Sequence, residues 1–156
     1  MHTLKNEYPA FGGSYNVVHH TQLINELVGA GKLKLNSDSA RVITFHDPCY
    51  LGRQNDILTE PRHVLQQAHT EMVEMERNGR KSFCCGAGGA QMWKEEEHGN
   101  ERVNANRFQQ ALSTGAEVLA VGCPFCMVML TDAGKDAGAQ MQVKDVAEIV
   151  VEAIEK

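Results

Sequence analysis

Short apolar runs alternate with amphipathic stretches along most of this chain of 156 residues. Runs rich in β-branched, aromatic or aliphatic side chains predict strands at residues 41–45, 71–76, 117–121 and around 141–143. Apolar positions three and four residues apart predict helices at residues 59–70, at 92–113 with a break at Gly99, and at 145–155. This alternation is typical of an α/β fold, so we expect a mainly parallel sheet with helices on both faces.

The first forty residues follow a different pattern. They predict a short helical stub, a glycine-rich turn around residues 9–15 and an amphipathic helix. Leu4, this turn and this helix are spaced much like Leu130, a later glycine-rich turn and the closing helix, which indicates an internal repeat. Two unrelated amphipathic helices are the alternative. From the repeat we expect residues 1–40 to be the helical tail of a preceding, missing sister domain, and residues 41–156 to form one domain.

Composition and charge argue against several classes of function. Hydrophobic residues make up 42% of the chain and charged residues 22%, as in ordinary globular proteins, and no apolar run approaches the ~20 residues that cross a bilayer. The net charge of -5 and the lack of a basic stripe argue against a nucleic-acid partner. The first residues do not resemble a secretory signal. We expect a cytoplasmic protein without membrane insertion of its own, or one held at the inner face of the membrane by missing segments.

Five cysteines carry most of the chemical information: Cys49, Cys84, Cys85, Cys123 and Cys126. Their odd number, in a chain that resembles a cytoplasmic protein, argues against a disulfide framework and favours metal ligands or catalytic thiols. Each cysteine group follows the end of a predicted strand. Because ligands of parallel sheets bind beyond the carboxyl ends of the strands, we expect the five thiols to converge there on one centre.

The cysteine spacing leaves three kinds of chemistry open. Soft thiolates select zinc, Cu(I) or iron–sulfur clusters. A structural zinc module would use four of the five cysteines, and a thiol–disulfide catalyst would need no metal. An extended cluster suits the adjacent Cys84 and Cys85, since neighbouring thiolates can then bind separate iron atoms. The glycine-rich residues 86–89 and the helix predicted to begin near Pro124 would supply N–H donors to such an anionic centre.

Three segments carry a family resemblance: residues 46–53 (HDPCYLGR), 84–89 (CCGAGG) and 122–126 (GCPFC). Over about residues 41–135 the chain resembles the cysteine-rich CCG domain of the heterodisulfide reductases and of the glycolate oxidase iron–sulfur subunit, and most of all the iron–sulfur electron-transfer-flavoprotein oxidoreductases. The resemblance implies a noncubane 4Fe–4S cluster held by all five cysteines. It also implies a C-terminal fragment, whose missing partners are an N-terminal CCG domain and a ferredoxin-like domain or subunit. Electrons would pass from a flavoprotein donor to a quinone or disulfide acceptor.

Residues near the cysteines invite further interpretation. His46 and Asp47 precede Cys49, and we expect them to support the bound centre rather than to activate a nucleophile. We expect Arg62 to lie at the surface. Trp93 is expected to fill the core.

Overall fold

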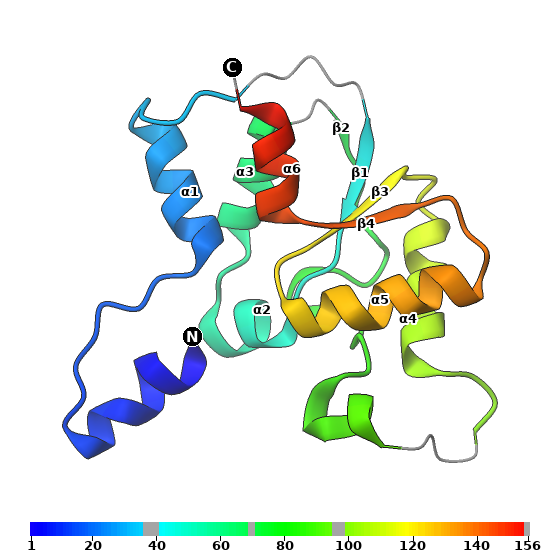
Figure 1. Cartoon of the computed structure of the whole chain (residues 1–156), viewed down its shortest axis with the longest axis horizontal. Coiled ribbons are helices and arrows are strands. Elements are labelled where there is room, and N and C mark those ends of the chain that lie inside the picture. The colour runs from blue at the N-terminus through cyan, green and yellow to red at the C-terminus, as the bar shows by residue number, and fades with distance from the viewer. Residues whose placement is uncertain (36–40, 69–70, 95–98, 155–156) are drawn as a thin grey trace.

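Four parallel strands form the centre of the protein, in a computed structural model that describes residues 1–35, 41–68, 71–94 and 99–154 (Figure 1). The strands are β1 (Val42–Phe45), β2 (Glu71–Met72), β3 (Val118–Val121) and β4 (Gln142–Asp145). Their order in the sheet is β2-β1-β3-β4, and each neighbouring pair is parallel. The predicted α/β fold with a parallel sheet is confirmed.

Alternate residues of β3 face opposite sides of the sheet, as the period of a strand requires. Val118 and Ala120 belong to one hydrophobic cluster, whereas Leu119 and Val121 belong to another. All four side chains are buried, with at most 2% of their surface exposed. A strand that is apolar on both faces needs helices on both sides, and this explains why the continuous apolar run predicted a central strand.

Two helices cover the first face of the sheet, α3 (Thr59–Ala68) and α6 (Val146–Ala153), and α1 (His20–Gly29) packs against both of them. Val64 and Leu65 of α3 and Ile149 of α6 are at most 1% exposed. A capping box begins α6, in which the side chain of Asp145 accepts from the N–H of Ala147 at 2.9 Å and the N–H of Asp145 donates to the side chain of Glu148 at 2.8 Å. The predictions of these helices are confirmed, except that residues 69–70 and 155 of the predicted ranges lie outside the described residues.

Helices α4 (Val103–Leu112) and α5 (Pro124–Asp136) cover the second face. The helix predicted over residues 92–113 is therefore wrong in its first half. A 3-10 segment, Gly88–Trp93, precedes α4, and Lys94 (φ -96°, ψ 150°) and Arg102 (φ -69°, ψ 141°) are extended, so the α-helix begins only at Val103. Residues 95–98 of the predicted helix lie outside the described part of the chain.

Strand β2 is much shorter than the predicted strand over residues 71–76. Only two residues pair with β1, at the edge of the sheet. The chain then leaves this edge, because Met75 is buried in the core of the second face with 1% of its surface exposed. A loop with a 3-10 turn at Gly79–Lys81 leads on to Cys84 and Cys85. The prediction that this cysteine pair directly follows a strand end is wrong.

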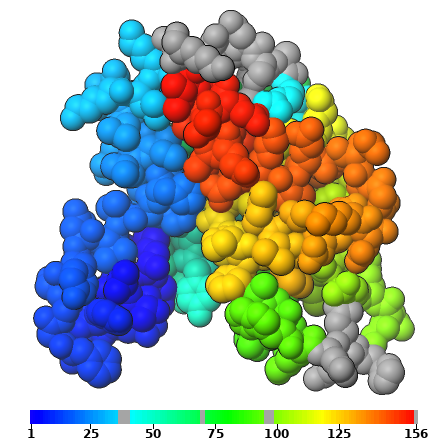
Figure 2. Space-filling model, in the orientation of Figure 1, coloured from blue at the N-terminus to red at the C-terminus, as the bar shows by residue number. Residues whose placement is uncertain are grey.

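The N-terminal residues form a lobe apart from the sheet, at the lower left of Figures 1 and 2. The lobe consists of a π-helical turn, Thr3–Glu7, and a 3-10 turn, Tyr8–Phe11. Asn6 Nδ2 donates a hydrogen bond to Asn55 Oδ1 at 3.1 Å, and Phe11 is 87% exposed. The division of the chain at residue 40 stays a prediction. No helix in the described ranges is long and apolar enough to cross a membrane.

Candidate metal centre

The five cysteines lie at the carboxyl edge of the sheet. Cys49 begins α2 (Cys49–Asn55) four residues after β1, and Cys123 caps α5 two residues after β3. Cys126 lies in the first turn of α5, and the loop brings Cys84 and Cys85 to the same place, since Cys85 packs in the same buried cluster as Cys126. All five are free thiols.

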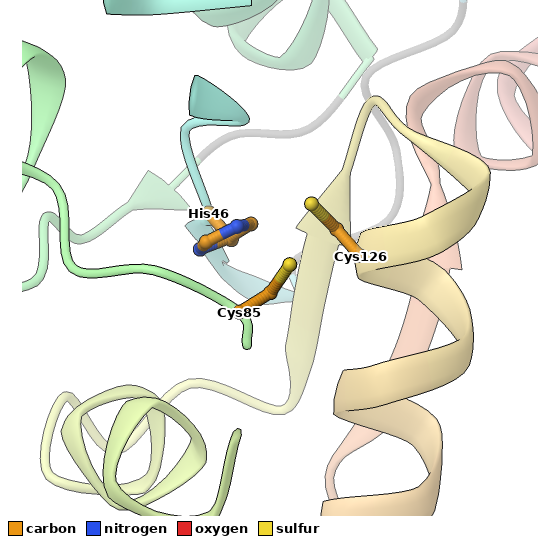
Figure 3. A group of neighbouring side chains, drawn as sticks. All are labelled: His46, Cys85 and Cys126. Atoms are coloured by element: carbon orange, nitrogen blue, oxygen red, sulfur yellow. The ribbon is translucent and has the colours of Figure 1, made fainter. Parts of the chain in front are cut away.

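A buried group of three side chains forms the centre of the site: His46, Cys85 and Cys126 (Figure 3). One ligating atom from each, a ring nitrogen and two sulfurs, lies within 4.8 Å of the others. His46 is 1% exposed, Cys126 3% and Cys85 5%. Burial lowers the pKa of His46, which favours a neutral imidazole. His46 thus lies inside the site that the sequence predicted it to support.

The sulfur atoms interact with one another across the site. Hydrogen bonds from the thiols of Cys126 and Cys84 hold the pKa of Cys85 far below its usual range. Donation to Cys85 raises the pKa of Cys84, and donation to Cys123 and Cys85 raises that of Cys126. Hydrogen bonding from Cys126 lowers the pKa of Cys123 to about 6. The charge of Cys49 acts on Cys84, which links the fifth thiol to the other four. The site therefore holds thiolates at neutral pH.

Backbone N–H groups face these sulfur atoms from two directions. The N–H of Gly86 donates to Sγ of Cys84 at 3.3 Å, and the N–H of Ala87 hydrogen bonds to Cys85. N–H groups in the first turn of α5 do the same for Cys123. Gly86 has a φ of 90°, and a Cβ atom on it would lie 3.3 Å from side chains of both α4 and α5. Glycine at this position therefore lets the backbone come close enough to donate.

A buried ion pair holds the turn that precedes Cys49. The Nη1 and Nη2 atoms of Arg62 donate to the two carboxylate oxygens of Asp47 at 2.7 and 2.9 Å, and Nε donates to Glu74 at 2.6 Å. The N–H of Gly79 donates to the same carboxylate of Asp47 at 2.7 Å. The Asp47 side chain is 2% exposed and that of Arg62 16%. The prediction that Arg62 lies at the surface is wrong, because its fork-shaped guanidinium joins β1, α3 and the loop before Cys84.

Sequence reasoning gave no role to Arg107, which is fully buried. Its Nε donates to Nδ1 of His46 at 3.0 Å. The sequence did carry a signal for the burial of Arg107, which is the helical spacing of the residues on the buried face of α4. These residues are Asn104, Arg107, Phe108 and Ala111. Two of those four positions carry polar side chains, and buried polar side chains need partners.

Three aromatic side chains near the cysteines are exposed: Tyr50 by 62%, Trp93 by 71% and Phe125 by 48%. The rings of Trp93 and Phe125 meet edge to face, with their centroids 5.9 Å apart. The prediction that Trp93 fills the core is wrong. It ends the 3-10 segment, and although the preceding Met92 packs against the core of the second face, the Trp93 side chain is exposed beside Phe125.

The donor set fits a thiophilic metal centre. The carboxylate of Asp47 is held by Arg62 and Gly79, so the donors that face one another are thiols and one imidazole. Such soft donors select zinc, Cu(I) or iron–sulfur clusters. Fold and site together define an α/β domain with a cluster of thiols at the carboxyl edge of its parallel sheet. The chain belongs to the family of cysteine-rich CCG domains, whose family model matches residues 43–131.

Similar proteins include an iron-sulfur-binding oxidoreductase, a quinone oxidoreductase and a heterodisulfide reductase subunit. The chain is 46% identical to the probable iron-sulfur-binding oxidoreductase FadF of Bacillus subtilis, over 96% of this chain and 22% of that protein. It is 42% identical to the EtfAB:quinone oxidoreductase of Syntrophomonas wolfei, over 97% of this chain and 22% of that protein. Identity to one component of the dihydromethanophenazine:CoB--CoM heterodisulfide reductase of Methanosarcina barkeri is 37%, over 90% of this chain and 34% of that protein. The chain thus spans about a fifth to a third of the length of these relatives.

Proposed function

We propose that this chain is an iron–sulfur redox domain of a larger, heterodisulfide-reductase-like oxidoreductase. A noncubane 4Fe–4S cluster would be held by its five cysteines, Cys49, Cys84, Cys85, Cys123 and Cys126. The observation that carries the proposal is that the five free thiols lie at one edge of the sheet. Hydrogen bonds connect Cys84, Cys85, Cys123 and Cys126, the charge of Cys49 acts on Cys84, and backbone N–H groups are directed at three of the sulfurs.

An iron–sulfur cluster accounts for this donor set better than zinc does. A zinc ion satisfied by four thiolates would leave one thiol over, and the adjacent Cys84 and Cys85 do not suit one tetrahedral ion. An extended cluster contains several iron atoms, so each of the two adjacent thiolates can bind a different iron atom. The name of the Bacillus subtilis relative, an iron-sulfur-binding oxidoreductase, also supports iron.

When bound, the cluster would accept and donate single electrons. The residues of this chain hold and tune it. N–H groups of Gly86, Ala87 and the first turn of α5 stabilise negative charge on the sulfurs, while burial of Cys85 and Cys126 keeps water away from them. The Asp47–Arg62 pair fixes the positions of the segments that deliver the thiols.

The electron donor and acceptor are proposed by analogy with the relatives. One is named as an EtfAB:quinone oxidoreductase and another as part of a heterodisulfide reductase, so a flavoprotein donor and a quinone or disulfide acceptor fit this chain. A second CCG domain and a ferredoxin-like domain or subunit would complete the electron path. In this scheme residues 1–40 belong to the sister domain, and residues 41–156 form the CCG domain that binds the cluster.

Anaerobic purification with iron, sulfide and zinc analysis tests the proposal. We expect a brown protein with iron and acid-labile sulfide, and each of the five Cys→Ser variants should lose iron or change its electron paramagnetic resonance spectrum. The matched control is Phe125→Leu, which alters the half-exposed side chain between two of the cysteines and should keep its iron. A colourless zinc protein, or a Cys84→Ser or Cys85→Ser variant with wild-type iron and spectrum, would overturn the five-ligand assignment.

A further inference from the structure

Arg107 is a buried cation whose hydrogen-bond partners, in the part of the chain that the structure describes, are all neutral. Its Nε donates to His46, Nη1 donates to the carbonyl of Arg77 at 2.8 Å and to Gln110 at 3.0 Å, and Nη2 donates to Ser82 at 3.3 Å. Burial lowers the pKa of Arg107 to about 10, so it stays cationic at neutral pH. A buried cation without a carboxylate partner costs stability, which points to a role other than stability.

The contact between Arg107 and His46 determines where the proton of the imidazole lies. A guanidinium has N–H donors and no acceptor. Because Arg107 Nε lies 3.0 Å from Nδ1 of His46, Nδ1 must present its lone pair and cannot carry a proton. The neutral ring then carries its proton on Nε2. The hydrogen bond thus selects one of the two tautomers by geometry alone.

The ring so fixed lies beside the sulfurs of Cys85 and Cys126 (Figure 3), with its ligating nitrogen within 4.8 Å of both. His46 also has a hydrogen-bonding interaction with Cys85. His46 follows β1, Arg107 lies in α4, Cys85 lies on the loop and Cys126 lies in α5. Four separate segments therefore meet at the second face, where they place one cation, one imidazole and two sulfurs together.

We propose that Arg107 is a positioning residue that holds His46 in its Nε2–H tautomer, so that this N–H donates to the thiolate of Cys85 and stabilises the reduced state of the centre bound there. The part of this inference that concerns reduction rests on the proposed function, whereas the tautomer does not. The step is the arrival of one electron from the flavoprotein donor, without proton transfer. The added negative charge is stabilised by the N–H dipole and by the guanidinium behind it, so both raise the midpoint potential.

The tautomer is tested first, in the reduced, metal-free full chain. Nuclear magnetic resonance of 15N-labelled histidine distinguishes Nε2–H from Nδ1–H rings, and the signal that disappears in His46→Gln assigns His46. We expect Nε2–H in the wild type and a mixture of tautomers in Arg107→Met. The matched control is Arg77→Met, which removes a neighbouring guanidinium that donates hydrogen bonds to Asn106 and Gln110. This variant should leave the tautomer of His46 unchanged. An Nδ1–H ring in the wild type would overturn the proposal.

Redox titration of the reconstituted protein tests the second part. His46→Leu and Arg107→Met should shift the midpoint potential to more negative values, and His46→Gln should recover most of the wild-type value because its amide can place an N–H near the position of Nε2. Arg77→Met should shift the potential less than Arg107→Met.

A His46→Leu protein with the wild-type potential would refute the donor role, and this variant carries the test if Arg107→Met does not fold. A wild-type chain that binds no iron, yet shows the Nε2–H tautomer, would refute the proposed function alone.

Discussion

The two faces of the sheet are built from different kinds of residues. The first face has a buried cluster made entirely of aliphatic and aromatic side chains. The second face has Cys85 and Cys126 in its buried cluster, and His46, Asn104 and Arg107 are buried near it. The cluster of the first face therefore contributes stability through apolar burial, whereas that of the second face also positions reactive groups.

This difference determines how each face should respond to change. Polar groups in a low-dielectric interior require partners, so those of the second face form a connected network in which each change affects its neighbours. An apolar cluster has no such network. A substitution in the apolar cluster of the first face should therefore lower stability and leave the thiol site intact, while one in the cluster of the second face should affect both.

The largest expected effect comes from removing one large side chain from each face. Leu65→Ala on the first face should lower the free energy of unfolding by about 2–5 kcal/mol, and Phe108→Ala on the second by about 3–5 kcal/mol, because each leaves a cavity. Both side chains are at most 1% exposed. Denaturant titration measures the stability, and iron per folded molecule measures the site. We expect iron loss in Phe108→Ala only, and equal loss in both variants would contradict the separation of the faces.

The next largest effect tests the ion pair beside the site. Arg62→Met leaves the carboxylate of Asp47 buried and without its cation, which should cost about 3 kcal/mol, the lower end for a broken buried pair, because Arg62 retains some exposure. Iron content should fall as well. Arg80→Met is the control, since its pair with Asp56 is 63% exposed on both sides and should be worth about 0–1 kcal/mol. A loss of stability in Arg62→Met no larger than that in Arg80→Met would show that Asp47 does not depend on Arg62.

The elements that could be predicted from the sequence are those whose signals are local. Strands β1 and β3 are short apolar runs, and α3 and α6 have apolar residues at helical spacing, so neighbouring residues carried the information. β2 pairs with one strand only, at the sheet edge, and its apolar run continues into a loop. The helix predicted from residue 92 failed because amphipathic spacing does not reveal that Lys94 and Arg102 adopt extended conformations, so the α-helix begins only at Val103.

The parts of the site that could not be predicted depend on contacts between distant residues. The cysteines were found because their chemistry and spacing are visible in the chain. The partner of Arg62 lies 15 residues away, and that of Arg107 lies 61 residues away. Nothing in a local pattern distinguishes an arginine that reaches a buried carboxylate or imidazole from one that faces water. Only the fold assigns these two roles.

A smaller effect comes from helix packing on the second face. A Cβ atom at Gly134 in α5 would lie 3.0 Å from the ring of Phe108, whereas one at Gly29 in α1 would meet nothing within 4 Å. Overpacking at Gly134→Ala should outweigh the helix propensity of alanine and cost about 1 kcal/mol. Gly29→Ala should instead stabilise the protein by up to about 1 kcal/mol. Thermal unfolding measures both, and a stabilised Gly134→Ala would show that the second face tolerates closer packing than its geometry suggests.

The smallest expected effect is an ion-pair network beside the first face. Glu152 of α6 accepts hydrogen bonds from Lys144 of β4 and from Arg41 at 2.7 Å, and these interactions lower its pKa. A carboxylate whose pKa is lowered on folding adds stability above its unfolded pKa of about 4.3, and this stability is lost as the pH falls through the folded value.

Glu152→Gln should therefore cost about 0.5 kcal/mol at pH 7, because the pair is partly exposed and screened by salt. The difference from wild type should vanish in acid, while Glu7→Gln, at an exposed position of the N-terminal lobe, should show no difference at either pH. Denaturant titrations at several pH values measure this, and a loss that persists in acid would contradict the ion-pair origin. In the native protein at pH 7, Glu152→Gln should keep the iron content of the wild type, since Glu152 lies on the side of the sheet that carries no thiols.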